Sequence, residues 1–350
     1  MSPRTAVCRL ACTALALLFL FAPAKAAGMI RAADWDAYKA KFVDPSGRVV
    51  DDGNGGISHS EGQGYGLLLA FLADNRADFE QIWSFTRTEL LLRDDGLAAW
   101  KWDPNAQPRV TDLNNASDGD ILIAYALARA GTAWDRDDLT QAASTIADAV
   151  GKEAVAEQQG RKLLMPAAAG FGPGDRKDGP VVNLSYLVFE AFPELARVAP
   201  DTDWKRIADD GRALIERARF SPRKLPPDWL SLKTRPRPAD GFAEEFGYNA
   251  LRIPLYLVRA GTEDPALLTA LAAGMQGSDG NVHIVDLDTG ADKAALAEAG
   301  YRAIPALIAC VVDGKKMPAD LAAFQPSVYY PSTLHLLALA FAAEKHPECL

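Results

Sequence analysis

Segments with the apolar spacing of a helix recur along almost the whole chain, and they constrain the fold more than any other feature. Each carries apolar residues three and four positions apart, as a helix with one buried face requires. The eleven segments are 32–42, 62–72, 76–92, 118–129, 137–150, 184–192, 203–219, 248–258, 265–276, 292–312 and 331–344. Strand patterns are few, chiefly at 282–287 and more weakly at 163–165. Because no Pro-, Gly- or Ser-rich linker interrupts this series, we expect one all-α ring of helices.

The first 26 residues have the layout of a secretory signal peptide. Arg4 and Arg9 precede an apolar run at 14–21, and Ala24, Lys25 and Ala26 follow it. This order predicts cleavage after Ala26 and export to the periplasm or the medium. The apolar run is too short to span a bilayer, and later apolar runs are broken by charge, Gly or Pro. We therefore expect a signal peptide at 1–26, a single domain at 27–350 and no membrane anchor.

The charge of the mature chain excludes one class of partner. The leader removes three of the 37 basic residues and no acid, which leaves 34 Lys and Arg against 46 Asp and Glu, a net charge of −12. Nucleic acid is therefore excluded as a partner. Cys310 and Cys349 are the cysteines of the mature chain; Cys310 has the surroundings of a small core residue, and their pairing is left open.

Two carboxylates stand at the entrance of one predicted helix. The run Asn115-Ala116-Ser117-Asp118-Gly119-Asp120 leads directly into an apolar segment. Ser117 or Asp118 could cap that helix through a side-chain oxygen. The unpaired N–H groups of a helix start favour a charged carboxylate, so we expect Asp118 to be ionised near neutral pH and able to hold a sugar hydroxyl or a developing cation. The alternative is a capped helix with no further role.

A second acidic site lies upstream, in the run Ser60-Glu61-Gly62-Gln63-Gly64-Tyr65-Gly66. The three glycines leave space around Glu61 and Tyr65 through which a substrate could approach the backbone. A glutamate at the entrance of an apolar helix is partly desolvated, which favours its protonated form and suits it to proton donation. The alternative is a first-turn glutamate that interacts with the helix dipole.

These two segments resemble glycoside hydrolase family 8, the inverting endoglucanases, chitosanases and xylanases. The run from Ala116 to Trp134 matches the family signature except at Ala128, and the run around Glu61 matches the family's proton-donor segment without a break. The resemblance is nearest to cellulases encoded beside bacterial cellulose synthases, and it extends from Trp35 to Ala342. It implies an (α/α)6 barrel with minor β segments on its loops, and catalytic roles for Glu61 and Asp118.

Aromatic side chains provide candidate sugar contacts. Irregular stretches at 96–114, 167–183 and 221–246 are expected to wall a cleft at one end of the barrel, and the first contains Trp100 and Trp102. Rings stack on sugar C–H faces while hydroxyls reach charged groups. The resemblance adds Tyr186, Tyr248, Arg252 and Tyr330, and Tyr65 accompanies Glu61. One of the two tryptophans could instead belong to the core.

The segment Gly247-Tyr248-Asn249-Ala250-Leu251-Arg252 departs from the family pattern. The family presents its general base as an aspartate at the position of Asn249. An amide can orient water but cannot take its proton at neutral pH. Substitutes are Asp118 or, preferably, the loop acids Glu244 and Glu245, and Asn249 then becomes a substrate-binding residue.

No cofactor or metal is expected, since the four histidines show no ligand spacing. We predict an endo-acting β-1,4-glucanase, with a catalytically impaired glucan-binding relative as the alternative. Chitosan, mixed-linkage glucan and xylan also remain open as substrates. The resemblance further implies association with a cellulose-synthesis apparatus, and we expect a monomer.

Overall fold

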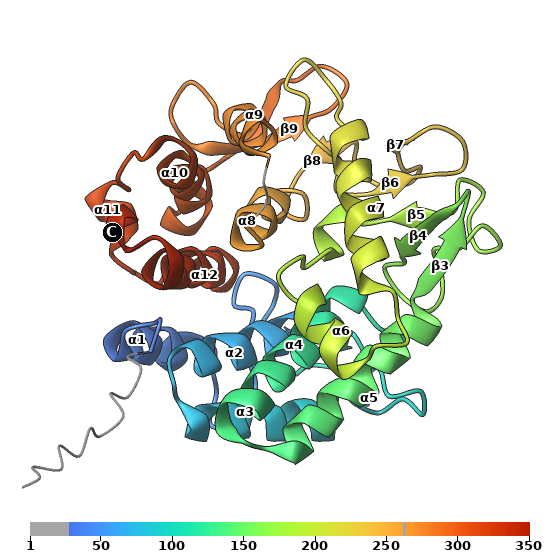
Figure 1. The fold of residues 1–350 in the computed structure, drawn as a ribbon, viewed down its shortest axis with the longest axis vertical. Helices are drawn as coiled ribbons and strands as arrows, with labels where there is room; N and C mark the ends of the chain where they lie inside the picture. Colours follow the sequence, from blue (N-terminus) through green and yellow to red (C-terminus); the bar gives the residue numbers. More distant parts are fainter. Residues whose placement is uncertain (1–27, 262–263) are drawn as a thin grey trace, which may run out of the picture.

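The computed structural model describes residues 28–261 and 264–350, so the predicted signal peptide lies outside the described part. Its helices are α1 Ala32–Phe42, α2 Ser60–Leu72, α3 Arg76–Glu89, α4 Ser117–Trp134, α5 Asp137–Glu153, η1 Leu184–Tyr186, α6 Phe192–Val198, α7 Trp204–Arg217, α8 Arg252–Arg259, α9 Pro265–Met275, α10 Ala299–Asp313, α11 Ala319–Ala322, α12 Tyr329–Lys345 and η2 Pro347–Cys349. Figure 1 shows that these helices follow one another around a closed circuit, in which blue α1 and α2 lie beside red α12. The predicted helical ring is confirmed.

The inner wall of the ring consists of α2, α4, η1, α8, α10 and α12, each in contact with the next, and α12 contacts α2. The Tyr38 hydroxyl of α1 forms a hydrogen bond of 2.8 Å with the Thr333 hydroxyl of α12, which ties the first helix to the last. Phe42 packs edge-on against Tyr329 at the same seam. This architecture is the (α/α)6 barrel, and the seam explains how distant parts of the chain share one core.

The inner helices α2 and α4 approach closely because glycines line their contact. A Cβ on Gly119 would lie 2.1 Å from the Ser60 hydroxyl oxygen and 2.6 Å from the Glu61 nitrogen. A Cβ on Gly64 would lie 2.6 Å from that of Leu122. These glycines therefore permit close helix packing, and Gly119 brings Glu61 next to the start of α4. The prediction that the glycines around Glu61 open a path for substrate is wrong, because Gly62, Gly64 and Gly66 are buried.

The helix predicted at 184–192 is a short 3₁₀ turn, η1, followed by extended chain and then α6. Leu184, Leu187, Val188 and Phe189 are all buried. A segment that is buried on every side satisfies a helical apolar pattern without being a helix, since periodicity cannot distinguish the two. The Asn183 side chain accepts a hydrogen bond from the Ser185 nitrogen and starts the turn. The irregular backbone leaves Ser185 and Tyr186 facing the interior of the ring.

The helix predicted at 292–312 also begins late, because 292–296 forms a strand. Alanine and lysine favour a helix locally, but this segment pairs antiparallel with the predicted strand at 282–287. The strands are β1 Ser58–His59, β2 Lys101–Trp102, β3 Val155–Gln158, β4 Arg161–Leu164, β5 Val181–Val182, β6 Leu230–Ser231, β7 Arg237–Pro238, β8 Glu245–Phe246, β9 Val282–Asp286 and β10 Asp292–Leu296. They form four small antiparallel sheets, ordered β1-β2, β3-β4, β5-β6-β7 and β8-β9-β10.

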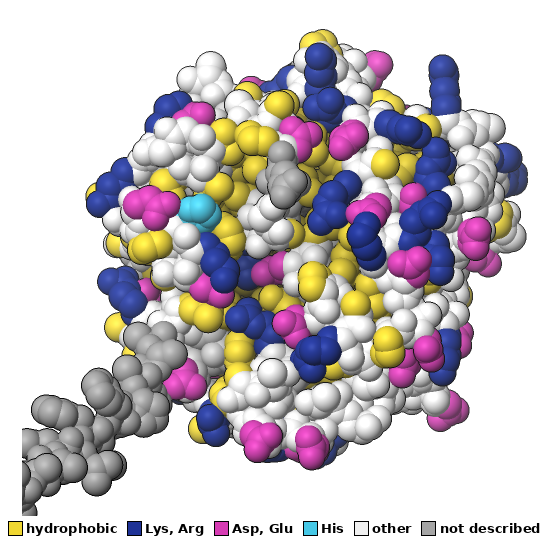
Figure 2. All heavy atoms as spheres, viewed as in Figure 1, with side chains coloured by type: hydrophobic (Ala, Val, Ile, Leu, Met, Phe, Trp, Pro, Cys, Tyr) yellow, Lys and Arg dark blue, Asp and Glu magenta, His cyan; other side chains and the backbone are white. Residues whose placement is uncertain are grey.

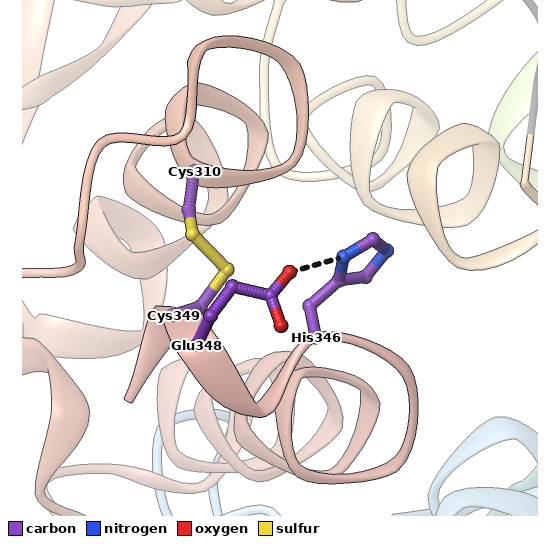
Figure 3. The surroundings of a disulfide bond; sticks show 4 residues. All are labelled: Cys310, His346, Glu348 and Cys349. Carbon is purple, nitrogen blue, oxygen red and sulfur yellow. Dashed lines mark hydrogen bonds and ion pairs between the residues drawn. A yellow bond between two sulfur atoms is a disulfide. The ribbon is translucent and has the colours of Figure 1, made fainter.

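A disulfide joins Cys310 of α10 to Cys349 near the C-terminus, across a separation of 39 residues (Figure 3). The sequence left this pairing open. Closing a loop of this length restricts the unfolded chain, and the loop-entropy relation gives about 3–4 kcal/mol of stabilisation. The His346 ring and the Glu348 carboxylate form a hydrogen bond of 3.0 Å beside it. The bond fixes the end of the chain on the inner helix that contributes Tyr301 to the site described below.

The outer surface carries acidic and basic side chains intermingled over the face shown in Figure 2. Several form ion pairs within one helix, such as Arg206 with Asp210 on α7. None of the helices in the described ranges has the length and apolarity needed to cross a bilayer.

Candidate active site

A pocket of about 770 Å³ lies where the N-terminal ends of the inner helices meet. The starts of α2, α4, α8, α10 and α12 all contribute lining residues, as do η1 and the loop 51–57. Helix N-termini carry unpaired N–H groups and positive dipole ends, which suit an acidic site. The pocket collects most of the residues predicted from sequence: Glu61, Trp100, Asp118, Tyr186, Tyr248, Asn249, Arg252 and Tyr330.

Arg252 holds the two predicted acids together. The guanidinium is 2% exposed and forms ion pairs with the carboxylates of Glu61 and, at 3.3 Å, Asp118. Its Nη2 also donates to the Ser185 hydroxyl at 3.0 Å and to the Asn249 amide oxygen at 3.3 Å. Burial works against the charge of Arg252, but the Glu61 carboxylate and the surrounding tyrosines together outweigh it, so the guanidinium pKa lies above its usual value. The arginine is therefore a permanent cation between the carboxylates.

Asp118 is 2% exposed and does not behave as the sequence predicted. Burial and the neighbouring Glu61 charge raise the pKa of Asp118 above its usual range, against the opposing effect of Arg252. The expected ionised state at neutral pH rested on the helix dipole alone, and desolvation outweighs that dipole. Glu61 and Asp118 are thus a coupled pair in which a proton is readily held.

Neither Ser117 nor Asp118 caps α4. The N-cap position is Ala116, which makes no side-chain cap bond, and the Ser117 hydroxyl donates instead to the Met165 carbonyl at 2.7 Å. One Asp118 oxygen accepts only from the adjacent Gly119 nitrogen, and the other faces Arg252. The carboxylate of Asp118 is consequently available to the pocket.

Asp120, the second acid of the signature, lies outside the pocket and holds neighbouring segments by hydrogen bonds. It accepts hydrogen bonds of 2.8 Å from the Ala98 nitrogen and from the Asn115 amide. Burial raises the pKa of Asp120 to about 7. The Ala98 bond ties α4 to the segment that carries Trp100, whose carbonyl accepts from the Ser60 nitrogen. Asp120 therefore places Trp100 at the pocket wall.

Tyr65, predicted to contact substrate, lies behind the pocket. It is fully buried, and its hydroxyl bonds to that of Tyr256 and accepts from Arg252 at 3.3 Å. Position 65 is one helical turn beyond Glu61, which directs the ring into the barrel core rather than into solvent. Tyr65 therefore holds Arg252 in place by a hydrogen bond from the side of the barrel core.

Trp102 also lies outside the pocket lining. Its ring packs edge-on against Phe85 and lies under the guanidinium groups of Arg48 and Arg109. The indole nitrogen donates to Glu89 at 3.0 Å. Residues two apart on a regular strand would share one face, but Trp100 lies at a bend just before β2 and lines the pocket, whereas Trp102 on the strand packs against Phe85 of the outer helix α3.

The loop acids Glu244 and Glu245 are not placed to act as a base. Neither lines the pocket. Glu245 lies on β8 and forms an ion pair with Lys293 of the neighbouring hairpin, and Glu244 is exposed beside it. The hairpin of β9 and β10, which the sequence did not predict in full, draws these carboxylates to the outer surface.

Asn249 is held by an acid that sequence analysis missed. Asp228 is 8% exposed and accepts from the backbone nitrogens of Gly247 and Ala250, at 2.9 and 2.8 Å. Its second oxygen lies 3.3 Å from both the backbone and the amide nitrogen of Asn249. Burial raises the pKa of Asp228, while these bonds oppose the shift. The turn before α8 is thus organised around one buried carboxylate.

Replacing Asn249 with aspartate is expected to destabilise the protein at neutral pH. The new carboxylate would lie beside Asp228, while the Arg252 guanidinium that faces the same side chain is already paired with Glu61 and Asp118. The like charge of Asp228 therefore dominates and raises the pKa of one member by about 1–3 units, or about 1–4 kcal/mol. A carboxyl pKa raised in the folded state costs stability as pH rises above the unfolded value of about 4. Chemical denaturation of Asn249→Asp should therefore show a deficit at pH 7 that shrinks toward pH 4. Asn249→Ala, which adds no charge, is the control, and an equal pH dependence in both variants would contradict the prediction.

The pocket also contains residues that sequence analysis did not select, chiefly Asp51, His59, Trp229, Glu298 and Tyr301. Trp229 lies in the stretch 221–246 that was expected to wall the cleft, so its ring could have been chosen on that ground. It is stacked between Phe171 and Phe242, at ring-centre distances of 5.4 and 4.5 Å. Glu298 was assigned to a helix interior, and the late start of α10 moves it to the pocket.

Within the described ranges, no group of three or more His, Cys, Asp or Glu side chains is arranged to hold a metal ion. Four carboxylates from those ranges line the pocket: Asp51, Glu61, Asp118 and Glu298. Together with Arg252 and the aromatic rings, they can bind sugar hydroxyls and transfer protons.

A closed ring of paired helices whose N-termini surround coupled carboxylates and aromatic rings defines the protein as a glycoside hydrolase. The chain belongs to the glycosyl hydrolases of family 8, whose sequence profile matches residues 5–344. It is 38% identical over 319 residues to a probable endoglucanase of Novacetimonas hansenii, which covers 90% of this chain and 91% of that protein.

Solved structures agree with this assignment. An endo-β-1,4-glucanase from Acetobacter xylinum superposes with a TM-score of 0.79 at 35% identity, over 91% of this chain and 98% of that one. A family 8 endoglucanase from Klebsiella pneumoniae gives a TM-score of 0.80 at 31% identity, over 89% of this chain and 100% of that one.

Proposed function

We propose that this protein is an exported endo-acting β-1,4-glucanase that inverts configuration at the anomeric carbon, with Glu61 as its general acid. The observation that carries the proposal is the placement of Glu61 beside Asp118 and Arg252 in a pocket walled by aromatic rings. Relatives similar over most of their length are named endoglucanases, which supports a β-1,4-glucan substrate.

In the proposed reaction, Glu61 protonates the oxygen of the leaving sugar while water attacks the opposite face of the ring. When the proton of the pair is on Glu61, as a general acid requires, Asp118 is the ionised member. It contacts the sugar whose ring is distorted and stabilises positive charge as the bond breaks. Tyr186 and Trp229 form one ring pair in the pocket, with centres 6.2 Å apart, and Trp100 lines it as well. Tyr248, Tyr301 and Tyr330 form a second cluster with mutual ring distances of 6.2–6.5 Å. Rings of this kind stack on sugar faces.

Inversion also needs a carboxylate that takes a proton from the attacking water. Asn249 orients that water but cannot accept its proton. Asp51 is bonded to His59, and Asp118 to Arg252. The Glu298 side chain makes no hydrogen bond or ion pair with any residue in the described ranges and lines the pocket. Glu298 therefore replaces the loop acids as the proposed base.

An assay of the mature protein on carboxymethylcellulose, mixed-linkage glucan, chitosan and xylan tests the function. We expect reducing ends from carboxymethylcellulose, with viscosity falling faster than reducing ends appear because cleavage is internal. The first-formed product should be the α-anomer by NMR, and Glu298→Gln should abolish most of the rate. Asn249 favours one competitor, a glucan-binding relative without turnover, for which binding without any released sugar would be the signature.

The proposal also includes the location of the protein and its partners. Export rests on the predicted signal peptide, and the disulfide of Cys310 and Cys349 supports it, because such bonds persist in oxidising compartments. Association with a cellulose-synthesis apparatus and a monomeric state are implied by the resemblance alone and stay predictions.

A further inference from the structure

His59 lies between the loop 51–57, at the edge of the pocket, and the helix α2, which carries Glu61. Its Nδ1 accepts a hydrogen bond of 2.9 Å from the Gly62 nitrogen, which caps α2. Its Nε2 lies 3.3 Å from the Asp51 carboxylate on the loop 51–57. The side chains of His59 and Asp51 are each 14% exposed. A Cβ on Gly62 would lie 3.2 Å from the imidazole, so the ring occupies space that the glycine leaves.

These two bonds define one protonation state of the ring. The Gly62 nitrogen can only donate, so Nδ1 must be an unprotonated acceptor. The Asp51 carboxylate accepts, so Nε2 must carry the proton. His59 is therefore neutral in the arrangement that the structure shows.

The position of the loop 51–57 at the edge of the pocket depends on the same hydrogen bonds of His59. Asp51 also accepts from the Gly53 nitrogen, and Asp52 accepts from the Tyr329 nitrogen at the start of α12. The loop is thus anchored to α12 through Asp52 and to α2 through Asp51 and His59. Gly53, Asn54 and Ile57 of this loop line the pocket.

Protonation of His59 would break this arrangement. A proton on Nδ1 would point at the Gly62 N–H, so the cap would be lost. The Glu61 carboxylate, 3.8 Å from Nδ1, is a charged acceptor for the new N–H. An imidazolium there would hold Glu61 ionised, whereas a general acid must carry its proton.

The groups around His59 determine the pH at which its ring is protonated. Asp51 faces it from the loop, Glu61 from its own helix and Asp118 from α4, while the Tyr329 ring of α12 meets it edge-on. Arg252 of α8, a cation, is paired with Glu61 on the far side of that carboxylate. Burial disfavours the imidazolium, but the carboxylates outweigh burial and raise the pKa of His59 above its usual value.

We propose that His59 is a positioning residue for Glu61, and that loss of its neutral form produces the acid limb of the pH–rate profile. The inference rests on the proposed glucanase function, with His59 acting through Glu61 and the loop 51–57 rather than on the substrate.

Asp51→Asn tests the proposal. The asparagine oxygen can still accept from Nε2, so the ring keeps its tautomer, but the charge that favours the imidazolium is lost. We expect the midpoint of the acid limb of kcat/KM to move down by about one pH unit, since a neighbouring opposite charge shifts a pKa by about 1–3 units. The midpoint is the quantity compared, whatever the rate at neutral pH.

His59→Asn is the matched variant. Asparagine is a good N-cap, so α2 keeps its start while the titrating ring is removed. We expect the limb assigned to His59 to disappear and the neutral rate to fall by a few-fold. An unchanged midpoint in Asp51→Asn, together with an unchanged limb in His59→Asn, would overturn the proposal.

A readout independent of hydrolysis separates this proposal from the proposed function. The ¹⁵N shifts of the His59 ring should report the Nε2–H tautomer at neutral pH, and a pKa that falls in Asp51→Asn. If these shifts agree but no glucan is cleaved, the proposed function fails while the positioning of His59 stands. If the ring is the Nδ1–H tautomer, the positioning role is wrong.

Discussion

Glu61→Gln is expected to lower the hydrolysis of carboxymethylcellulose by about 100-fold or more, the usual contribution of a general acid. Glutamine has the same shape and keeps an oxygen that can accept from Arg252, but it has no proton to donate to the leaving sugar. The side chain is 20% exposed and makes no helix cap, so the fold should survive. Oligosaccharide binding measured by calorimetry should be retained while kcat falls.

Glu245→Gln provides a matched control for the same chemical change. Its carboxylate pairs with Lys293 outside the pocket. Exposed ion pairs of this kind contribute at most about 1 kcal/mol, so this variant should keep the wild-type rate within about twofold. If Glu61→Gln retains more than about a tenth of the wild-type rate, the general acid is another residue.

Asp118→Asn is expected to lower kcat by about 100- to 1000-fold, the usual effect of removing one side chain that stabilises the charge of a transition state. Asparagine keeps the bond to the Gly119 nitrogen, and the helix loses no cap because Ala116 occupies that position. The variant should therefore fold and bind oligosaccharide, but fail to stabilise the positive charge that develops on the sugar.

The same variant should be more stable than its parent at neutral pH. The pKa of Asp118 is raised in the folded protein, so ionising it costs stability as pH rises above the unfolded value of about 4. Denaturation curves at pH 4 and pH 7 should show the gain of Asp118→Asn growing with pH. Asp120→Asn, on the same helix but outside the pocket, should lose stability although the pKa of Asp120 is also raised, because both of its oxygens accept hydrogen bonds and the new amide nitrogen would face a donor. Its fall in kcat should be smaller. Unfolding of Asp118→Asn at pH 7 would support a purely structural role instead.

Much of the barrel was predictable from local patterns. The bounds of α1 agree with the sequence pattern at both ends, α2 and α9 agree to within two residues, and α4 continues five residues beyond its predicted end. Their apolar spacing, caps and glycines act over a single helical turn, so neighbouring residues suffice to specify them. The signature residues Glu61 and Asp118 could likewise be found because each lies at a helix start.

The segments and side chains that the sequence predicted wrongly share a different cause. The segment at 184–192 is buried on all sides, and that at 292–296 pairs with a strand ten residues away, so partners in space override local preference. Tyr65 and Trp102 have the right residue type next to the right motif, yet their backbone positions direct them to the core and to α3. Which face of a helix or strand looks into a pocket depends on the neighbouring elements.

The sequence by itself determined the helical ring, the two acids and the departure at Asn249, because each of these features depends on interactions between residues that are close together in the chain. Only the tertiary structure decided which acids are coupled, which rings line the pocket, and that Asp228, His59 and Glu298 belong to the site. Burial sets the pKa of Asp118 and a distant arginine holds it. Desolvation and ion pairing depend on chain segments far apart in sequence, which meet only when the ring closes.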